Sequence, residues 1–240
     1  MSERQITIAI DAMGGENSPF KIISGTKLFL KNYSKVKVVF FGEENELEKQ
    51  IKLNKFTDYN YEIINTNEIV SDDESPFSAA KKGKDTSMWQ SIEAQKKNNY
   101  DITLSAGNTG ALLVISRLIL STINGINKPA LAALWPNENN MNVVLDLGAN
   151  IECTEKNLAD FACMGAALFR SLFLKELPKV ALLNVGLEEH KGNDVLKKTH
   201  NILKNNKTKN FDFCGFIEGN QIMDGNIDVI ITDGFTGNIA

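Results

Sequence analysis

The sequence predicts an α/β fold in which a largely parallel sheet lies between two layers of helices. Short apolar runs alternate with longer helical patterns along the chain, and strands separated by helices favour a parallel sheet with crossover connections. The strand-like runs, such as VKVVFF (36–41) and VALLNV (180–185), are almost continuously apolar. Because such strands are typical of a sheet covered on both faces, we expect a three-layer α/β/α architecture.

Each expected element follows from its local pattern. Short apolar runs bounded by turn residues predict strands, and apolar residues at helical spacing predict helices. The expected strands are 6–10, 36–41, 61–64, 102–104, 131–135, 143–147, 180–185, 211–217 and 227–232. The expected helices are 19–31, 43–52, 81–97, 108–120, 157–174 and 194–203. The runs 131–135 and 143–147 fit either a hairpin or two separate strands of the sheet.

The domain organisation is expected to be simple. No repeat and no low-complexity linker interrupts the chain, so residues 1–240 are expected to form a single α/β domain. The sequence stops at DGFTGNIA, where a strand-to-helix turn is expected to lead into a further helix. We therefore expect the chain to be truncated at its C-terminus.

The composition suits a globular protein of the cytoplasm. The net charge of −4 gives no overall basic field that would attract nucleic acid. The three cysteines are scattered, which argues against a disulfide framework or a zinc site and fits a reducing compartment. No signal peptide precedes the first strand, and no run approaches the roughly 20 apolar residues of a membrane-spanning helix.

Five of the apolar runs end in polar loops that contain glycine. These loops are DAMGG (11–15), SAGNTG (105–110), DLGAN (146–150), LNVGLEEHKGN (183–193) and DGFTGN (233–238). Because ligands of an open parallel sheet bind at the carboxyl ends of its strands, we expect the loops to meet at one crevice. Glycine and asparagine are also ordinary turn residues, so one loop alone is weak evidence.

The loop 105–110 has the character of an anion site, since it joins a strand to the start of a helix. It lacks the lysine of a nucleotide phosphate loop and the three glycines of a dinucleotide fold. No histidine pairs with a cysteine or serine nucleophile in the five loops. Cys163 is expected to be a packed core thiol, and His190 and His200 are expected to be solvated. The acidic run at 72–74 has no matching ligand set, so no metal site is expected.

Several motifs together carry a family resemblance. In order they are AIDAMGGENSP, SPFSAAKKGKDTSM, SAGNTGALL, KPALAALWP, LDLGAN, LLNVGLEEHKGN, GFIEGN and DVIITDGFTGN. From residue 6 to residue 240 the sequence resembles the bacterial phosphate acyltransferases of phospholipid synthesis. The resemblance implies a fold like those of isocitrate/isopropylmalate dehydrogenases and phosphotransacetylases. It also implies transfer of a fatty acyl group from acyl-carrier protein to inorganic phosphate, without a cofactor.

The resemblance further implies partners. Family members are homodimers that associate peripherally with the inner face of the cell membrane and pass acyl-phosphate to a glycerol-phosphate acyltransferase. Acyl-carrier proteins are acidic as a class. The cluster of basic residues Lys81, Lys82 and Lys84 is the candidate for contacting the carrier protein.

The implied reaction needs no protein nucleophile, because free phosphate attacks the thioester carbonyl. We expect the N–H groups of residues 107–110 and the Thr109 hydroxyl to cradle phosphate. Lys191 is expected to offset the phosphate charge or to polarise the carbonyl. Asn108, with Asn193 or Asn238, is expected to donate amide hydrogens to the developing oxyanion.

The candidate site residues fall into two groups. The catalytic candidates are Lys191, Asn108 and Asp233. The candidates for binding phosphate or substrate are Asp11, Gly14, Gly15, Lys84, Ser105, Gly107, Thr109, Gly110, Asp146, Asn150, Asn193, Gly234, Thr236 and Asn238. Asp11 and Asp233 either orient Lys191 and the loops or simply cap strand ends.

Three other functions remain open from the residues. A phosphotransacetylase would perform nearly the same chemistry on a coenzyme A thioester. A nicotinamide-dependent dehydrogenase would share the fold, but the missing three-glycine fingerprint and acidic metal cluster argue against it. A non-catalytic scaffold that binds an acyl carrier or phosphate would use the same loops without turnover.

Overall fold

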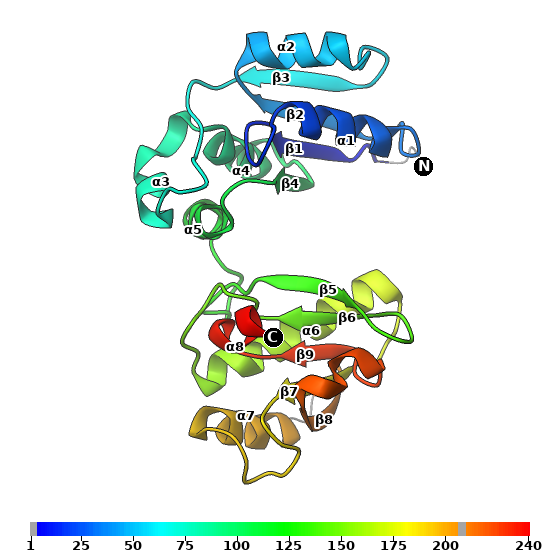
Figure 1. Ribbon diagram of the computed structural model, residues 1–240, viewed down its shortest axis with the longest axis vertical. Coiled ribbons are helices and arrows are strands. Elements are labelled where there is room, and N and C mark those ends of the chain that lie inside the picture. The colour runs from blue at the N-terminus through cyan, green and yellow to red at the C-terminus, as the bar shows by residue number, and fades with distance from the viewer. Residues whose placement is uncertain (1–3, 206–209) are drawn as a thin grey trace. The chain divides into compact units, whose positions relative to one another are not determined.

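The computed structural model describes residues 4–205 and 210–240. The chain forms two compact units, divided between Ser121 and Thr122, and each has its own sheet and helices (Figure 1). The sequence prediction of one domain did not anticipate this division. Residues 121–129 (STINGINKP) contain the glycine, asparagine and proline signals of a connecting segment, although they are not of low complexity.

Unit 1 contains a four-stranded parallel sheet in the order β3-β2-β1-β4. Its strands are β1 (Thr7–Asp11), β2 (Lys37–Gly42), β3 (Tyr61–Asn65) and β4 (Ile102–Ser105). Its helices are α1 (Phe20–Leu30), α2 (Glu44–Leu53), α3 (Pro76–Lys82), α4 (Ser87–Asn98) and α5 (Thr109–Leu120). The helix expected over 81–97 is instead the end of α3, a 3-10 turn over Gly83–Asp85, and α4, because Gly83 adopts a φ of 70°.

Both faces of the unit 1 sheet are covered by helices (Figure 1). Ile10 and Phe40 pack on one side with residues of α1 and α2. Val39 and Phe41 pack on the other side with Ala94 of α4. Successive strand residues therefore all find apolar surroundings, which explains the continuous apolar runs in the sequence.

Unit 2 contains a five-stranded sheet in the order β5-β6-β9-β7-β8. Its strands are β5 (Ala132–Pro136), β6 (Met141–Leu145), β7 (Lys179–Leu183), β8 (Asp212–Ile217) and β9 (Val229–Ile231). Its helices are α6 (Glu155–Phe173), α7 (Asp194–Lys204) and the short α8 (Gly234–Ile239), with a 3-10 segment over Gly219–Asp224. Strands β5 and β6 pair antiparallel, and the other pairs are parallel. The alternative left open for 131–147 is thus resolved as a hairpin within the sheet.

Helices α6 and α7 cover one face of the unit 2 sheet. Phe161 and Phe169 of α6 and Leu203 of α7 are buried against strand residues. Gly165 allows the close approach of α6, since a Cβ there would lie 2.5 Å from Val229 Cγ1 and 2.6 Å from Leu145 Cδ1. In the described part of the chain, no helix is long and apolar enough to cross a membrane.

Two side chains lie elsewhere than expected. His200 is buried because it lies on the inward face of α7, where its ring stacks on Phe216 with centroids 4.9 Å apart. Cys163 lies on the outer side of α6 and is exposed, so it is not a core thiol. His190 is exposed, as expected.

Candidate functional site

The candidate residues of unit 1 are organised around the carboxylate of Asp11, which is buried at the carboxyl end of β1. Ser105 is the register partner of Asp11 on β4, and its hydroxyl donates to Asp11 Oδ2 over 2.7 Å. Ser87, the first residue of α4, donates its hydroxyl to Asp11 Oδ1 over 2.6 Å. One carboxylate therefore ties together β1, β4 and the start of α4.

The loops 11–15 and 105–110 lie against each other through their glycines. A Cβ on Gly14 would lie 2.7 Å from Asp11 Oδ2 and 2.8 Å from the Gly107 nitrogen. Gly15 has a φ of 87° and faces the carbonyl of Ala106. The structure thus brings together Asp11, Gly14, Gly15, Ser105 and Gly107, as predicted for one edge of a sheet.

Burial raises the pKa of Asp11 above its ordinary value of 3.8. The hydrogen bonds from Ser87 and Ser105 act in the opposite direction, because they stabilise the ionised form, but desolvation is the largest effect. Its two oxygens accept hydrogen bonds from Ser87 and Ser105, so the carboxyl group holds the surrounding loop.

Asn108 serves a structural purpose at the start of α5. Its Oδ1 accepts a hydrogen bond from the Ala111 N–H over 3.0 Å, which caps the helix. Its Nδ2 donates to the carbonyls of Glu74, over 2.8 Å, and Asp72, over 3.0 Å. To donate to an oxyanion, the Asn108 amide would have to give up these contacts. Next to it, Thr109 is exposed at the first position of the helix.

Lys84 is exposed on the 3-10 turn between α3 and α4, and no hydrogen bond or ion pair between described residues joins it to the Asp11 cluster. Its neighbour Lys82 forms an ion pair with Glu74 over 2.8 Å, and Lys81 is also exposed. The three lysines therefore lie on a basic surface rather than among the glycine loops.

In unit 2 a second buried carboxylate, Asp146, has a similar position after β6. Its Oδ1 accepts from the N–H groups of Leu131 and Ala149, each over 3.0 Å. Its Oδ2 accepts from the backbone and side-chain nitrogens of Asn150, over 2.8 and 2.7 Å. The side chain of Asn150 also donates to the Pro129 carbonyl over 2.7 Å. Asp146 and Asn150 therefore hold the loop 146–150 in place.

The start of α8 packs on this loop through glycines. The Gly234 N–H donates to the Asn150 carbonyl over 2.8 Å, and a Cβ on Gly237 would collide with the Asp146 carbonyl. Asp233 caps α8, since its carboxylate accepts from the N–H of Thr236 over 2.8 Å and from its hydroxyl over 3.0 Å. Asp233, Gly234, Thr236 and the neighbouring Asn238 are thus placed beside the loop 146–150.

Lys191 lies in the loop that follows β7, and the buried Asn184 holds this loop. Asn184 Nδ2 donates to the carbonyls of Gly186, over 3.1 Å, and Lys191, over 3.3 Å. Gly192, with a φ of 82°, leaves room for the Asn184 amide. The Lys191 side chain is exposed and makes no ion pair within the described part of the chain. Asn193 caps α7 through an Oδ1 contact of 2.9 Å to the Leu196 N–H.

The sequence analysis missed two residues of this arrangement, Ser87 and Asn184. Asn184 had a recognisable signal, because it ends an apolar strand just as Asp11 and Asp146 do. Ser87 had none, since only the folded structure brings the start of α4 to the end of β1.

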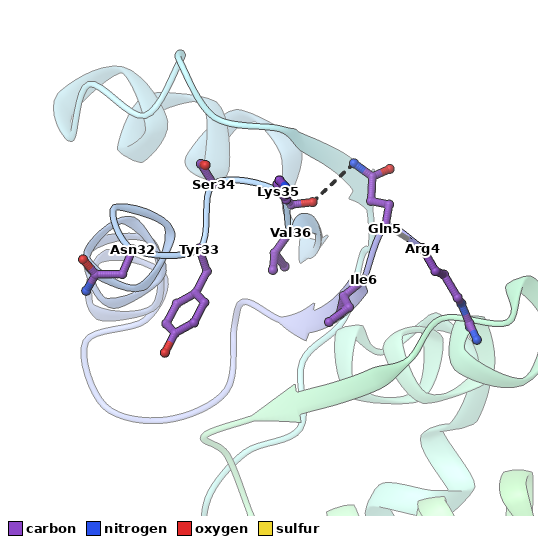
Figure 2. Close-up of a pocket in the computed structure, with 8 residues that line it drawn as sticks. All are labelled: Arg4, Gln5, Ile6, Asn32, Tyr33, Ser34, Lys35 and Val36. Carbon is purple, nitrogen blue, oxygen red and sulfur yellow. Dashed lines mark hydrogen bonds between the residues drawn. The ribbon is translucent and has the colours of Figure 1, made fainter. Parts of the chain in front are cut away.

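Other features of the described residues offer no competing site. A pocket of about 620 Å³ lies at the amino ends of β1 and β2, lined by Gln5, Ile6, Tyr33 and their neighbours (Figure 2). None of the predicted site residues lines it. Burial raises the pKa of the Cys153 thiol, which disfavours the thiolate. Residues 4–205 and 210–240 contain no group of three or more His, Cys, Asp or Glu side chains that could hold a metal ion.

The fold is similar to those of two solved structures. A phosphotransacetylase from Staphylococcus aureus matches with a TM-score of 0.70 at 16% identity, covering 98% of this chain and 80% of that chain. A branched-chain phosphotransacylase from Enterococcus faecalis matches with a TM-score of 0.62 at 15% identity, covering 98% and 82%. The expected α/β fold with largely parallel sheets, similar to phosphotransacetylases, is confirmed.

Sequence comparison identifies the family. The family model described as fatty acid synthesis protein matches residues 6–240. A phosphate acyltransferase of Pelagibacter ubique is 52% identical over 235 residues, which are 98% of this chain and 70% of that protein. One of Rhodopseudomonas palustris is 40% identical over 238 residues, which are 99% and 67%. The chain belongs to this family of phosphate acyltransferases, and the family and enzyme class expected from the sequence are confirmed.

The raised pKa of Asp11 predicts a pH-dependent contribution to stability. The folded state binds this proton more tightly than the unfolded chain, so stability falls as pH rises from about 4 towards the folded-state pKa. Over that pH window, we expect the free energy of unfolding of the wild type to fall relative to that of Asp11→Asn. Above the folded-state pKa, we expect the difference between the two proteins to be constant. Denaturant titrations at a series of pH values measure it.

The exposed aspartate variant Asp58→Asn serves as the control for this measurement. A wild type that gains stability relative to Asp11→Asn as pH rises would contradict the raised pKa.

Proposed function

We propose that the chain transfers a fatty acyl group from acyl-carrier protein to inorganic phosphate, giving acyl-phosphate for phospholipid synthesis. The observation that carries the proposal is the loop 105–110, held by buried contacts at the start of a 12-residue helix with Thr109 exposed. Such a loop suits a small anion, and the family reaction uses phosphate as its nucleophile.

The phosphate is held by unit 1. The N–H groups of residues 108–110 lie at the positive end of the α5 dipole, which favours an anion, whereas the Gly107 N–H donates to Ser105 Oγ over 3.2 Å. The Thr109 hydroxyl adds a donor. Asp11 and Asn108 act as positioning residues, because their polar atoms already bind the surrounding backbone and hydroxyl groups.

In the reaction, a phosphate oxygen forms a bond to the thioester carbonyl carbon, and the carbon–sulfur bond then breaks. The thiol of the carrier leaves as the electron pair returns from the oxyanion, and it takes up a proton from solvent. Fixed hydrogen-bond donors at the developing oxyanion lower the barrier for such a step. The catalytic contribution of the protein is therefore electrostatic.

Candidate donors of this kind lie in unit 2. We propose that the ammonium group of Lys191 donates to the thioester carbonyl oxygen. Lys191 is exposed, and its loop is held by hydrogen bonds from the buried Asn184. Asn193 and Asn238 are better amide donors than Asn108, because their Nδ2 atoms make no hydrogen bond to any described residue. Asp233 maintains the start of α8 beside them.

Replacing Lys191 tests this assignment. Lys191→Ala is expected to lower kcat for acyl-phosphate formation by about 100-fold or more, as loss of an oxyanion donor does in other enzymes. The fold is expected to be unchanged, because the side chain is exposed. The measurement is acyl-phosphate production from acyl-carrier protein and phosphate, with Lys198→Ala as the control.

Near-normal turnover by Lys191→Ala would contradict the role of this lysine. A higher kcat/KM with acyl-coenzyme A than with the carrier protein would instead indicate a phosphotransacetylase-like enzyme. Protection by phosphate against unfolding without any product would indicate binding without catalysis.

The carrier protein is proposed to dock on the exposed lysines 81 and 84. Because the partner is acidic as a class, charge reversal should weaken the encounter and leave the chemical step intact. The double variant Lys81→Glu, Lys84→Glu is expected to raise KM for acyl-carrier protein with little effect on kcat. Lys31→Glu is the matched control. If the double variant has an unchanged KM for acyl-carrier protein, these lysines are not the docking surface.

The remaining proposals rest on the family resemblance. They are a homodimer, a cytoplasmic location with peripheral contact to the inner face of the membrane, and delivery of acyl-phosphate to a glycerol-phosphate acyltransferase. Sedimentation of the chain at the mass of a monomer would contradict the dimer.

A further inference from the structure

Unit 2 contains an open groove of about 800 Å³ at the carboxyl ends of β7 and β9. This is within the range of small-molecule sites. Its apolar wall consists of Leu183, Val185, Leu196, Phe235 and Ile239. Asn184, Asn193, Asp233 and Thr236 supply its polar side chains.

The apolar side chains at this groove are unusually accessible for their type. Val185 is 81% exposed and Phe235 60%, and Ile239 lies beside them. They come from the loop after β7 and from α8, which are far apart in sequence, and they line the same groove. Clustered exposed apolar side chains beside a polar site are a common mark of a ligand surface.

The groove is a poor site for a small, wholly polar anion such as phosphate, since no described lysine, arginine or histidine lines it. Among the described residues that line it, Asp233 alone has an ionisable side chain, and its carboxylate accepts hydrogen bonds from the N–H and hydroxyl of Thr236. Its polar residues Asn193 and Asp233 are themselves candidates for the reacting end of the site. A ligand that fits therefore has a polar group at one end and an extended apolar part at the other.

We propose that this groove holds the fatty acyl chain of the thioester substrate. The inference rests on the proposed function and extends it by assigning the acyl subsite to Val185, Leu196, Phe235 and Ile239. The thioester carbonyl then lies at the polar end, near the loop that carries Lys191. Phe235 also lines an adjoining pocket of about 480 Å³, so a change at this position affects both spaces.

Chain length should therefore control binding. Burial of methylene groups strengthens binding by about tenfold for each two added groups while the groove is being filled. We expect cis-parinaric acid, an 18-carbon fluorescent fatty acid, to bind saturably to the chain. Palmitate should displace it at lower concentration than octanoate does.

A charged substitution in the groove tests the assignment. Phe235→Asp is expected to weaken binding of cis-parinaric acid at least tenfold, because a carboxylate would then face the apolar chain. The matched control is Leu174→Asp, an apolar residue that is 89% exposed, lies in the same unit and does not line the groove. Thermal unfolding of both variants reports whether the fold is retained, and Val185→Asp decides the question if Phe235→Asp does not fold.

Equal effects of the groove and control variants, or no saturable binding, would overturn the proposal. So would sedimentation in which Phe235→Asp separates two copies of the chain while probe binding is unchanged, since the groove would then be an interface. Probe binding does not depend on turnover, so the two proposals fail separately. Absent acyl-phosphate formation contradicts the proposed function alone, and long-chain turnover unaffected by Phe235→Asp contradicts the acyl subsite alone.

Discussion

Each unit depends on a buried carboxylate at the end of a strand. Asp11 and Asp146 are almost completely removed from solvent, and a buried polar group costs about 1–3 kcal/mol for each hydrogen bond it lacks. The surrounding backbone and hydroxyl groups must therefore point toward these oxygens. That requirement fixes the loops 11–15 and 105–110 in unit 1 and the loop 146–150 in unit 2.

Glycine makes this arrangement possible. Gly14 lets the loop after β1 reach Asp11 and Gly107, and Gly234 and Gly237 let the start of α8 rest on the loop 146–150. A side chain at these positions would move the backbone away from the carboxylates. The glycine-rich motifs are thus explained by close packing of loops, which leaves a few donors exposed, among them Thr109 and Lys191, the groups that we propose contact the substrates.

The sequence predicted which polar residues lie at the carboxyl ends of the strands. It did not predict which of these residues bind the backbone and which keep a hydrogen-bond donor available. Polar loops after apolar strands predicted that Asp11 and Ser105 would meet, because parallel strands end at the same edge. Nothing in the sequence distinguishes Asn108, whose amide is used by the backbone, from Asn193, whose Nδ2 is not. The break of the expected helix at Gly83 and the division after Ser121 also depend on tertiary packing, which single-sequence patterns do not record.

We propose above that the loop held by Asp11 presents N–H groups to phosphate. Amide hydrogen exchange measures this directly, since bound phosphate would protect the amides that it contacts. We expect phosphate to slow exchange at residues 108–110 of the wild type, with the amides of α2 unchanged, and Asp11→Ala to lose this protection. Equal exchange at residues 108–110 with and without saturating phosphate would contradict phosphate binding by this loop.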